Sequence, residues 1–106
     1  MNVRPFNPES DPRPPYTAHF DAIVRATADQ LTQLLGKPYE EPDDKTFYEW
    51  DGAYEKDGTI IVFHVYDWKR KRRPYNDEPM YWNIGHFSPE DANTIKNALE
   101  DSLSKL

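Results

Sequence analysis

Alternating hydrophobic and polar positions predict four β-strands along this chain. In residues 17–26, apolar and polar side chains alternate with the period of two that is typical of a half-buried strand. The same alternation, carried mainly by aromatic residues, recurs in residues 45–55, and residues 59–68 form a β-branched and aromatic segment. The sequence Asp57-Gly58 between them is a strong hairpin signal. Residues 80–87 supply the fourth predicted strand.

Two further segments have the apolar periodicity of helices. Thr27 is followed three residues later by Gln30, which is the spacing of a capping box, and Gly36 is placed to end that helix. Ser88 is placed to cap a second helix, for which Pro89 suits the first position and whose apolar residues recur on one side toward the C-terminus. We therefore expect an α+β fold in the order β-α-β-β-β-α. Its mostly antiparallel four-stranded sheet should carry two helices on one face and leave the other face partly open to solvent.

Prolines distinguish an N-terminal arm from this domain. Half of the ten prolines fall within the first fifteen residues, where fixed φ angles and missing N–H donors exclude helix and central strand. We predict that residues 1–16 are a proline-rich arm and that residues 17–106 form a single α+β domain. Such an arm stays ordered only if something binds it, and the candidates are its own sheet edge, a second copy or a partner.

Composition narrows the classes of function. The chain has 14% aromatic residues, more than is typical of disordered proteins. It has 19 acidic and 13 basic residues, and the net charge of -6 argues against a general nucleic-acid binder. The absence of cysteine fits a reducing compartment. Because no segment approaches the roughly 20 apolar residues of a membrane span, and because the N-terminus lacks the apolar core of a signal peptide, we expect a cytoplasmic protein without membrane contact.

One basic cluster interrupts the acidic chain. Five consecutive basic residues, 69–73, are flanked by Trp68 and Tyr75, and guanidinium groups beside aromatic rings suit a phosphate-bearing ligand or a single nucleic-acid strand. The alternative interpretation is a solvated loop whose charge is balanced by nearby carboxylates. With side chains of the neighbouring strands included, the predicted binding residues are Trp68, Lys69, Arg70, Lys71, Arg72, Arg73, Tyr75, Trp82, His64 and Tyr66.

Signals for catalysis or metal binding are weak. His19, His64 and His86 lie on predicted strands with carboxylates such as Glu49 as potential partners, but their spacing matches no ligand pair such as His-x-x-x-His. No serine occupies a nucleophile elbow, and the 4 glycines are scattered rather than grouped in a phosphate-binding loop. We therefore predict a protein that is not an enzyme and that has no cofactor and no metal site.

Several short motifs resemble sequences from one group of phage proteins. The motifs are Gly36-Lys37-Pro38, Glu49-Trp50, Gly58-Thr59, Tyr66-Asp67-Trp68-Lys69 and Trp82-Asn83-Ile84-Gly85. The chain, from about Phe20 to the C-terminus, resembles a group of small uncharacterised accessory proteins encoded by tailed bacteriophages, and these motifs carry the resemblance. The resemblance implies an accessory phage product that acts in the cytoplasm of the bacterial host, where it antagonises a host enzyme or defence system.

These features lead to one main hypothesis and two alternatives. Tyr, Trp and Arg dominate binding hot spots, and the chain has more rings than one small core needs. We expect a non-enzymatic inhibitor or adaptor that docks on a host protein through the open sheet face, the basic loop and the arm. The first alternative is a nucleotide or nucleic-acid binder that uses the basic loop. The second is an acidic decoy, for which the carboxylates are too few. A homodimer formed through an exposed edge strand is left open.

Overall fold

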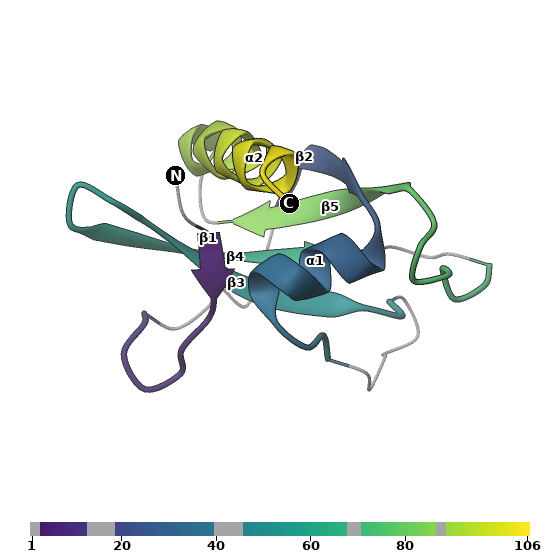
Figure 1. Ribbon diagram of the computed structural model, residues 1–106. Coiled ribbons are helices and arrows are strands. Elements are labelled where there is room, and N and C mark those ends of the chain that lie inside the picture. Colours follow the sequence, from purple (N-terminus) through teal and green to yellow (C-terminus); the bar gives the residue numbers. More distant parts are fainter. Residues whose placement is uncertain (1–2, 13–18, 40–45, 68–70, 87–88) are drawn as a thin grey trace.

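The computed structural model describes residues 3–12, 19–39, 46–67, 71–86 and 89–106, and Figure 1 shows their arrangement. The protein is α+β, as predicted, and no helix in these segments is both long enough and apolar enough to cross a membrane. In chain order the elements are β1 (Val3–Pro5), β2 (His19–Ala26), α1 (Ala28–Leu35), β3 (Glu49–Lys56), β4 (Thr59–Tyr66), β5 (Met80–His86) and α2 (Pro89–Ser104).

The described strands form one antiparallel sheet of five in the order β1-β3-β4-β5-β2. The prediction of four strands was wrong because the N-terminal arm contributes the fifth. Val3 lies opposite Tyr54 and Pro5 opposite Gly52, so β1 extends the sheet beyond β3. Proline is compatible with an edge strand, where one side of the backbone needs no donor. The side chain of Val3 belongs to the hydrophobic core, so this part of the arm is built into the domain.

Both helices cover the same face of the sheet, which confirms the predicted layering. α1 contacts β1 and β3, α2 contacts β2 and β5, and the two helices contact each other (Figure 1). The strand positions that face them alternate along the chain, and this alternation is the period of a half-buried sheet. The largest fully buried side chains of this layer are Trp50, Trp82, Phe63, Leu31, Ile84, Ile95 and Leu99.

Local signals in the sequence determine where α1 begins and ends. The Thr27 side-chain oxygen accepts a hydrogen bond from the Gln30 backbone N–H at 3.1 Å, and the Gln30 side-chain oxygen accepts one from the Thr27 N–H at 2.9 Å. This reciprocal pair is the predicted capping box. At the other end Gly36 has φ 84° and its N–H donates to the Thr32 carbonyl, so a residue that tolerates positive φ ends the helix.

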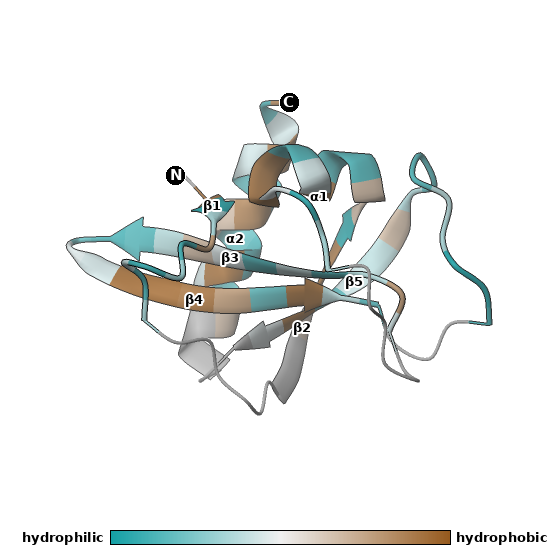
Figure 2. Ribbon diagram, turned by 90° about the horizontal axis from the view of Figure 1, so that it is seen from below, coloured by the Kyte–Doolittle hydropathy of each residue, from teal (hydrophilic) through white to brown (hydrophobic). Residues whose placement is uncertain are grey.

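The hairpin of β3 and β4 turns at the predicted residues. Asp57 has φ 52° and Gly58 has φ 81°, the two positive values that a tight two-residue turn requires. The register then runs without a break from Lys56 opposite Thr59 to Glu49 opposite Tyr66. Figure 2 shows the resulting contrast between a largely hydrophobic β4 and a more hydrophilic β3.

Three aromatic rings join the sheet to the loop that precedes β3. Trp50 and Trp82 meet edge to face with centroids 5.0 Å apart, and Tyr48 stacks on Trp50 at 5.5 Å. Such pairs stabilise a core beyond the area that they bury. The Trp82 indole N–H donates to the Ala26 carbonyl at 2.8 Å, which ties β5 to the end of β2. Trp50 and Trp82 are therefore core residues.

The face of the sheet opposite the helices is open only in part. Ala53 and Val62 point to this side, yet both are buried, with exposed fractions of 0% and 3%. On the same side at the β5–β2 end, Tyr81 is 59% exposed and Ile23 is 37% exposed. The region that is accessible to a partner is thus displaced toward β5 and β2.

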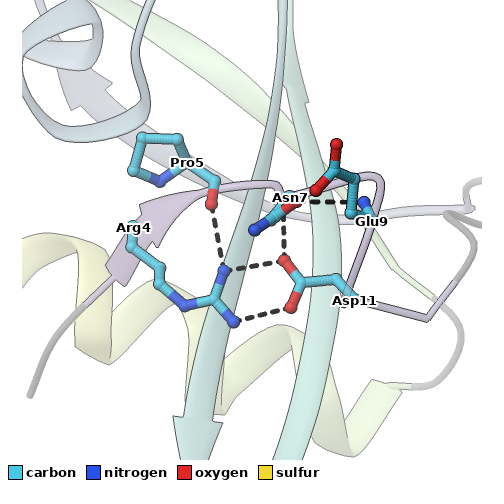
Figure 3. A network of polar contacts seen from close by, with 5 residues as sticks. All are labelled: Arg4, Pro5, Asn7, Glu9 and Asp11. Atoms are coloured by element: carbon cyan, nitrogen blue, oxygen red, sulfur yellow. Dashed lines mark hydrogen bonds and ion pairs between the residues drawn. The ribbon is translucent and has the colours of Figure 1, made fainter.

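An ion pair connects β1 to the segment that follows it (Figure 3). The Arg4 guanidinium donates two hydrogen bonds to the Asp11 carboxylate, at 2.7 and 2.6 Å, and the Asn7 N–H donates a third at 2.7 Å. Asn7 in turn accepts from the Glu9 N–H through its side-chain oxygen at 3.0 Å. The hydrogen bonds from Arg4 lower the pKa of the Asp11 carboxyl below its usual value. Residues 7–11 therefore form a compact turn bound to β1.

Replacing Asp11 with asparagine tests this ion pair through the pH dependence of stability. Because the folded-state pKa of Asp11 is lowered, the pair stabilises the fold above the unfolded-state pKa, and this contribution is lost as the pH falls through the folded-state value. We expect Asp11→Asn to reduce the free energy of unfolding by about 1 kcal/mol or less at neutral pH. Urea unfolding across the acid range should show the deficit closing. Arg4→Gln should behave alike, and a deficit that does not change with pH would contradict this account.

Gly52 allows β3 to pass close beneath α1, and this close approach gives a second test. A Cβ atom at position 52 would lie 2.5 Å from Cζ of Phe63 and 2.9 Å from Cδ2 of Leu35. We expect Gly52→Ala to destabilise the protein by about 1–3 kcal/mol through overpacking. Chemical denaturation of the single variants and of the double variant with Phe63→Leu measures the coupling. If Gly52→Ala costs as much in the Phe63→Leu background as in the wild-type background, the steric explanation is wrong.

Candidate functional site

In the described part of the basic cluster, Arg72 is already bound to a carboxylate. Its guanidinium donates to both oxygens of Glu78, at 3.0 and 2.8 Å, and lies 4.6 Å from the centroid of the Tyr75 ring. The hydrogen bonds with Glu78 raise the pKa of Arg72 above its usual value. Trp68, Lys69 and Arg70 lie outside the described residues. The charge of Arg72 is thus balanced within the loop.

Arg73 contacts the aromatic core rather than extending away from it. Its guanidinium lies 4.6 Å from the Tyr48 ring centroid, and Nε donates to the Tyr48 hydroxyl at 3.0 Å. The same hydroxyl donates to the side-chain oxygen of Asn76 at 2.9 Å, and the Asn76 carbonyl accepts from the Asp29 N–H at 3.0 Å. Arg73 therefore takes part in a network that joins the loop before β5 to the core and to α1.

The surroundings of Lys71 and Arg72 are poorly suited to a phosphate. The two side chains line a shallow hollow of about 210 Å³, but the Glu78 carboxylate forms part of the same wall. Tyr75, 66% exposed, is accessible to a ligand, whereas Trp82 is 0% exposed. The prediction of Trp82 as a binding residue is therefore wrong, since its ring has no face that a ligand could contact.

His64 and Tyr66, two further predicted binding residues, point away from the helices and lie opposite acidic residues of β3. His64 is paired with Asp51 across the strands, and Tyr66 with Glu49. The His64 Nδ1 atom lies 2.5 Å from Asp51 Oδ1 and 4.0 Å from Glu49 Oε1. The side chains of His64 and Asp51 are each 12% exposed, and that of Glu49 is 43% exposed. One imidazole and two carboxylates thus converge at the sheet surface.

The carboxylates of this cluster contribute to raised pKa values of two neighbouring tyrosines. Asp51 raises the pKa of the Tyr39 phenol, chiefly through charge, and Glu49 adds to the effect. The pKa of Tyr66 is raised first by burial and then by the charge of Glu49. Tyr39 is held nearby because its N–H donates to the Glu49 carbonyl at 2.8 Å. The cluster therefore presents a local field that favours cations.

The sequence contained a signal for this cluster that the spacing of the histidines did not reveal. Counting outward from the Asp57-Gly58 turn pairs Asp51 with His64, and Glu49 lies two residues further along the same face. His64 is remote in sequence from the two carboxylates but adjacent to them across the hairpin. Of the other two histidines, His19 and His86 are opposite each other in the β2–β5 register. A search for ligand pairs within one segment could not find the cluster.

The β5–β2 end of the sheet presents a different kind of surface. On the face away from the helices, Tyr81 lies opposite Arg25 and Asn83 lies opposite Ile23. Arg25 and Tyr81 are exposed, and Ile23 is partly so. In the described segments no strand pairs with the outer side of β2. An aromatic, an aliphatic and a cationic side chain therefore border an eight-residue strand edge.

The buried acid of the Tyr-Asp-Trp-Lys motif has a structural role. Asp67 is 0% exposed, and its Oδ1 accepts hydrogen bonds from the backbone N–H groups of Phe47 and Tyr48, both at 2.9 Å. These bonds satisfy two backbone donors immediately before β3. The motif therefore contributes a residue that connects the two ends of the β3–β4 hairpin.

Comparisons of the chain with protein-family models, with curated proteins and with solved structures found no significant match. The resemblance to phage accessory proteins thus stays a prediction. The protein has an α+β fold with two helices on one face of its sheet. Its other face carries the cluster of Glu49, Asp51 and His64, and exposed Tyr81 at the β5–β2 end.

Replacing Tyr48 with phenylalanine tests the loop network. The change keeps the ring contacts and removes the hydroxyl that accepts from Arg73 and donates to Asn76. We expect a loss of about 1–2 kcal/mol in the free energy of unfolding, because both partners are only partly rehydrated. Tyr75→Phe is the matched control, since Tyr75 is largely exposed and its ring contact with Arg72 is retained. Equal stability of the two variants in urea would show that the network contributes nothing.

Proposed function

We propose that this chain is a small non-enzymatic binding protein that docks on another protein through the β5–β2 end of its sheet. The observation that supports the proposal is the unpaired outer edge of β2, among the described strands, beside exposed Tyr81 and Arg25. An edge strand offers a row of backbone donors and acceptors to a segment from a partner. Strand addition of this kind derives affinity from the backbone and specificity from side chains.

The geometry of β2 favours strand addition. The strand spans His19–Ala26 and contains no proline, so its outer backbone groups are all chemically competent to pair. α2 packs on one face of β2, and β5 pairs with its inner edge. A partner segment could therefore add along the outer edge without displacing either element.

The side chains suggest the chemistry of the partner. Tyr and Arg are typical hot-spot residues, and Ile23, two residues from Arg25 on the same strand, adds an apolar side chain. Although the chain has a net charge of -6, the charged side chain described on this surface is the cation Arg25. We infer a partner strand with apolar positions and a carboxylate that lies opposite Arg25. If the phage resemblance holds, this partner is a host protein in the bacterial cytoplasm, and binding inhibits or redirects it.

A nucleotide or nucleic-acid ligand at the basic loop is the alternative, and it has weaker support. Arg72 is bound by Glu78 and Arg73 by Tyr48, so a phosphate would have to compete with contacts that are already formed. A ligand of this kind would give binding that weakens steeply with salt, because counterions are released from phosphates. Strand addition depends mainly on backbone hydrogen bonds and apolar contacts, and its salt dependence should be shallow.

The test is recovery of a partner from bacterial cells that express the untagged chain or its variants. We expect a complex that survives moderate salt, that persists with Tyr75→Ala, and that weakens by at least about thirtyfold with Tyr81→Ala or Arg25→Glu, the effect of losing one hot spot. Native mass spectrometry gives the stoichiometry. Hydrogen exchange on the identified complex should show slower exchange for β2 amides than in the free protein.

Three outcomes would count against this function. Undiminished binding by both Tyr81→Ala and Arg25→Glu would exclude the β5–β2 surface. If Lys71→Glu abolishes binding and the binding of the wild type weakens steeply with salt, the basic loop is the binding site instead. A chain that pairs only with a second copy of itself would replace the heterologous partner with a homodimer.

A further inference from the structure

We propose that Glu49, Asp51 and His64 form a binding site for one divalent transition-metal ion of the zinc type. The site is separate from the β5–β2 docking surface, and it does not depend on the function proposed above. It rests on the convergence of three ligand atoms from two adjacent strands.

The hairpin register brings the three side chains together. Glu49 and Asp51 are two residues apart on β3, so their side chains leave the sheet on the same face. His64 of β4 lies directly opposite Asp51, where facing Cβ atoms in an antiparallel pair are about 5 Å apart. Backbone pairing on both strands therefore positions all three ligands before any ion binds.

The distances between the ligand atoms require only small side-chain adjustments. Nδ1 of His64 and one carboxylate oxygen each of Asp51 and Glu49 all lie within 4.8 Å of one another. An ion bonded at about 2.0–2.2 Å to each would hold its ligand atoms about 3–4 Å apart. The close His64–Asp51 contact at 2.5 Å would open slightly, and the Glu49 carboxylate, 43% exposed, is able to move inward.

The donor set selects the class of metal. One imidazole nitrogen and two carboxylate oxygens suit Zn²⁺, Co²⁺ or Mn²⁺, whereas soft ions prefer thiolates, which this chain lacks. Three protein ligands leave at least one coordination position for water. The Glu49 side chain is 43% exposed, and Asp51 lines a surface hollow of about 230 Å³ together with Tyr39, so two of the three ligands are accessible to solvent.

A His–Asp hydrogen bond without any metal is the competing explanation. In that explanation Asp51 is the partner of His64, and the Glu49 carboxylate is a second anionic group 4.0 Å from the same nitrogen. Two carboxylates near one imidazole nitrogen repel each other, and a cation bound between them would reduce this repulsion.

The experiment is metal titration of the untagged, metal-free protein with Zn²⁺ by calorimetry and with Co²⁺ by visible absorption. We expect one ion per chain and intense Co²⁺ bands that indicate a low coordination number. Asp51→Asn and His64→Gln should each weaken Zn²⁺ binding by about a hundredfold or more, since even changes to outer-shell partners cost tenfold to a hundredfold. Glu49→Gln should weaken it while leaving the His64–Asp51 contact in place.

The control is Glu55→Gln, which removes a carboxylate from the same strand and the same face but outside the cluster. This variant should bind Zn²⁺ as the wild type does. Circular dichroism of each variant shows whether it folds. If the variants at Asp51 and His64 do not fold, Glu49→Gln, at a more exposed position, still tests the proposal. Wild-type protein that binds no ion at micromolar concentrations, or binding that is insensitive to Glu49→Gln and Asp51→Asn, overturns the proposal.

Discussion

The register between β3 and β4 is the constraint on which both faces of the sheet depend. Because side chains alternate along each strand, one register places Trp50 and Phe63 under the helices and places Asp51 and His64 on the opposite side. A slip of one residue would bury the acidic cluster and expose the aromatic core. The positive φ angles of Asp57 and Gly58 set that register at the turn. The acidic cluster and the core are therefore two consequences of a single hairpin.

The edges of this hairpin are held by contacts that come from remote parts of the chain. β1 pairs with β3 and is itself bound to the following turn through Arg4 and Asp11. At the other end, Asp67 and Tyr48 connect the ends of the hairpin to each other and to the loop before β5. These polar contacts stabilise the side of the sheet around β1 and β3, and they leave the β5–β2 side as its accessible part.

Local signals were enough to predict much of the fold, and the failures have physical causes. The capping box at Thr27 and the turn at Asp57-Gly58 act within a few residues, so the sequence reveals them directly. β1 escaped prediction because it is short and contains Pro5, and only its pairing with a distant strand makes it extended. The candidate site was harder to predict from the sequence than the fold. Arg72 looked available for a ligand until its contact with Glu78 was known, and the partners of His64 depend on strand pairing.

The distribution of charge bears on what kind of recognition this surface can support. A basic cluster in an acidic chain suggests attraction to polyanions, but Arg72 and Arg73 are occupied by a carboxylate and a phenol within the same molecule. The ion pair with Glu78 shortens the range of the field of Arg72, because paired charges act on a ligand as a dipole, whereas Arg73 keeps its charge beside the Tyr48 phenol. The carboxylates of Asp51 and Glu49 likewise lie beside the imidazole of His64 in the same molecule. Among the described residues, selectivity therefore comes from groups in direct contact with a partner: a strand edge, two or three exposed side chains, and a compact set of ligand atoms.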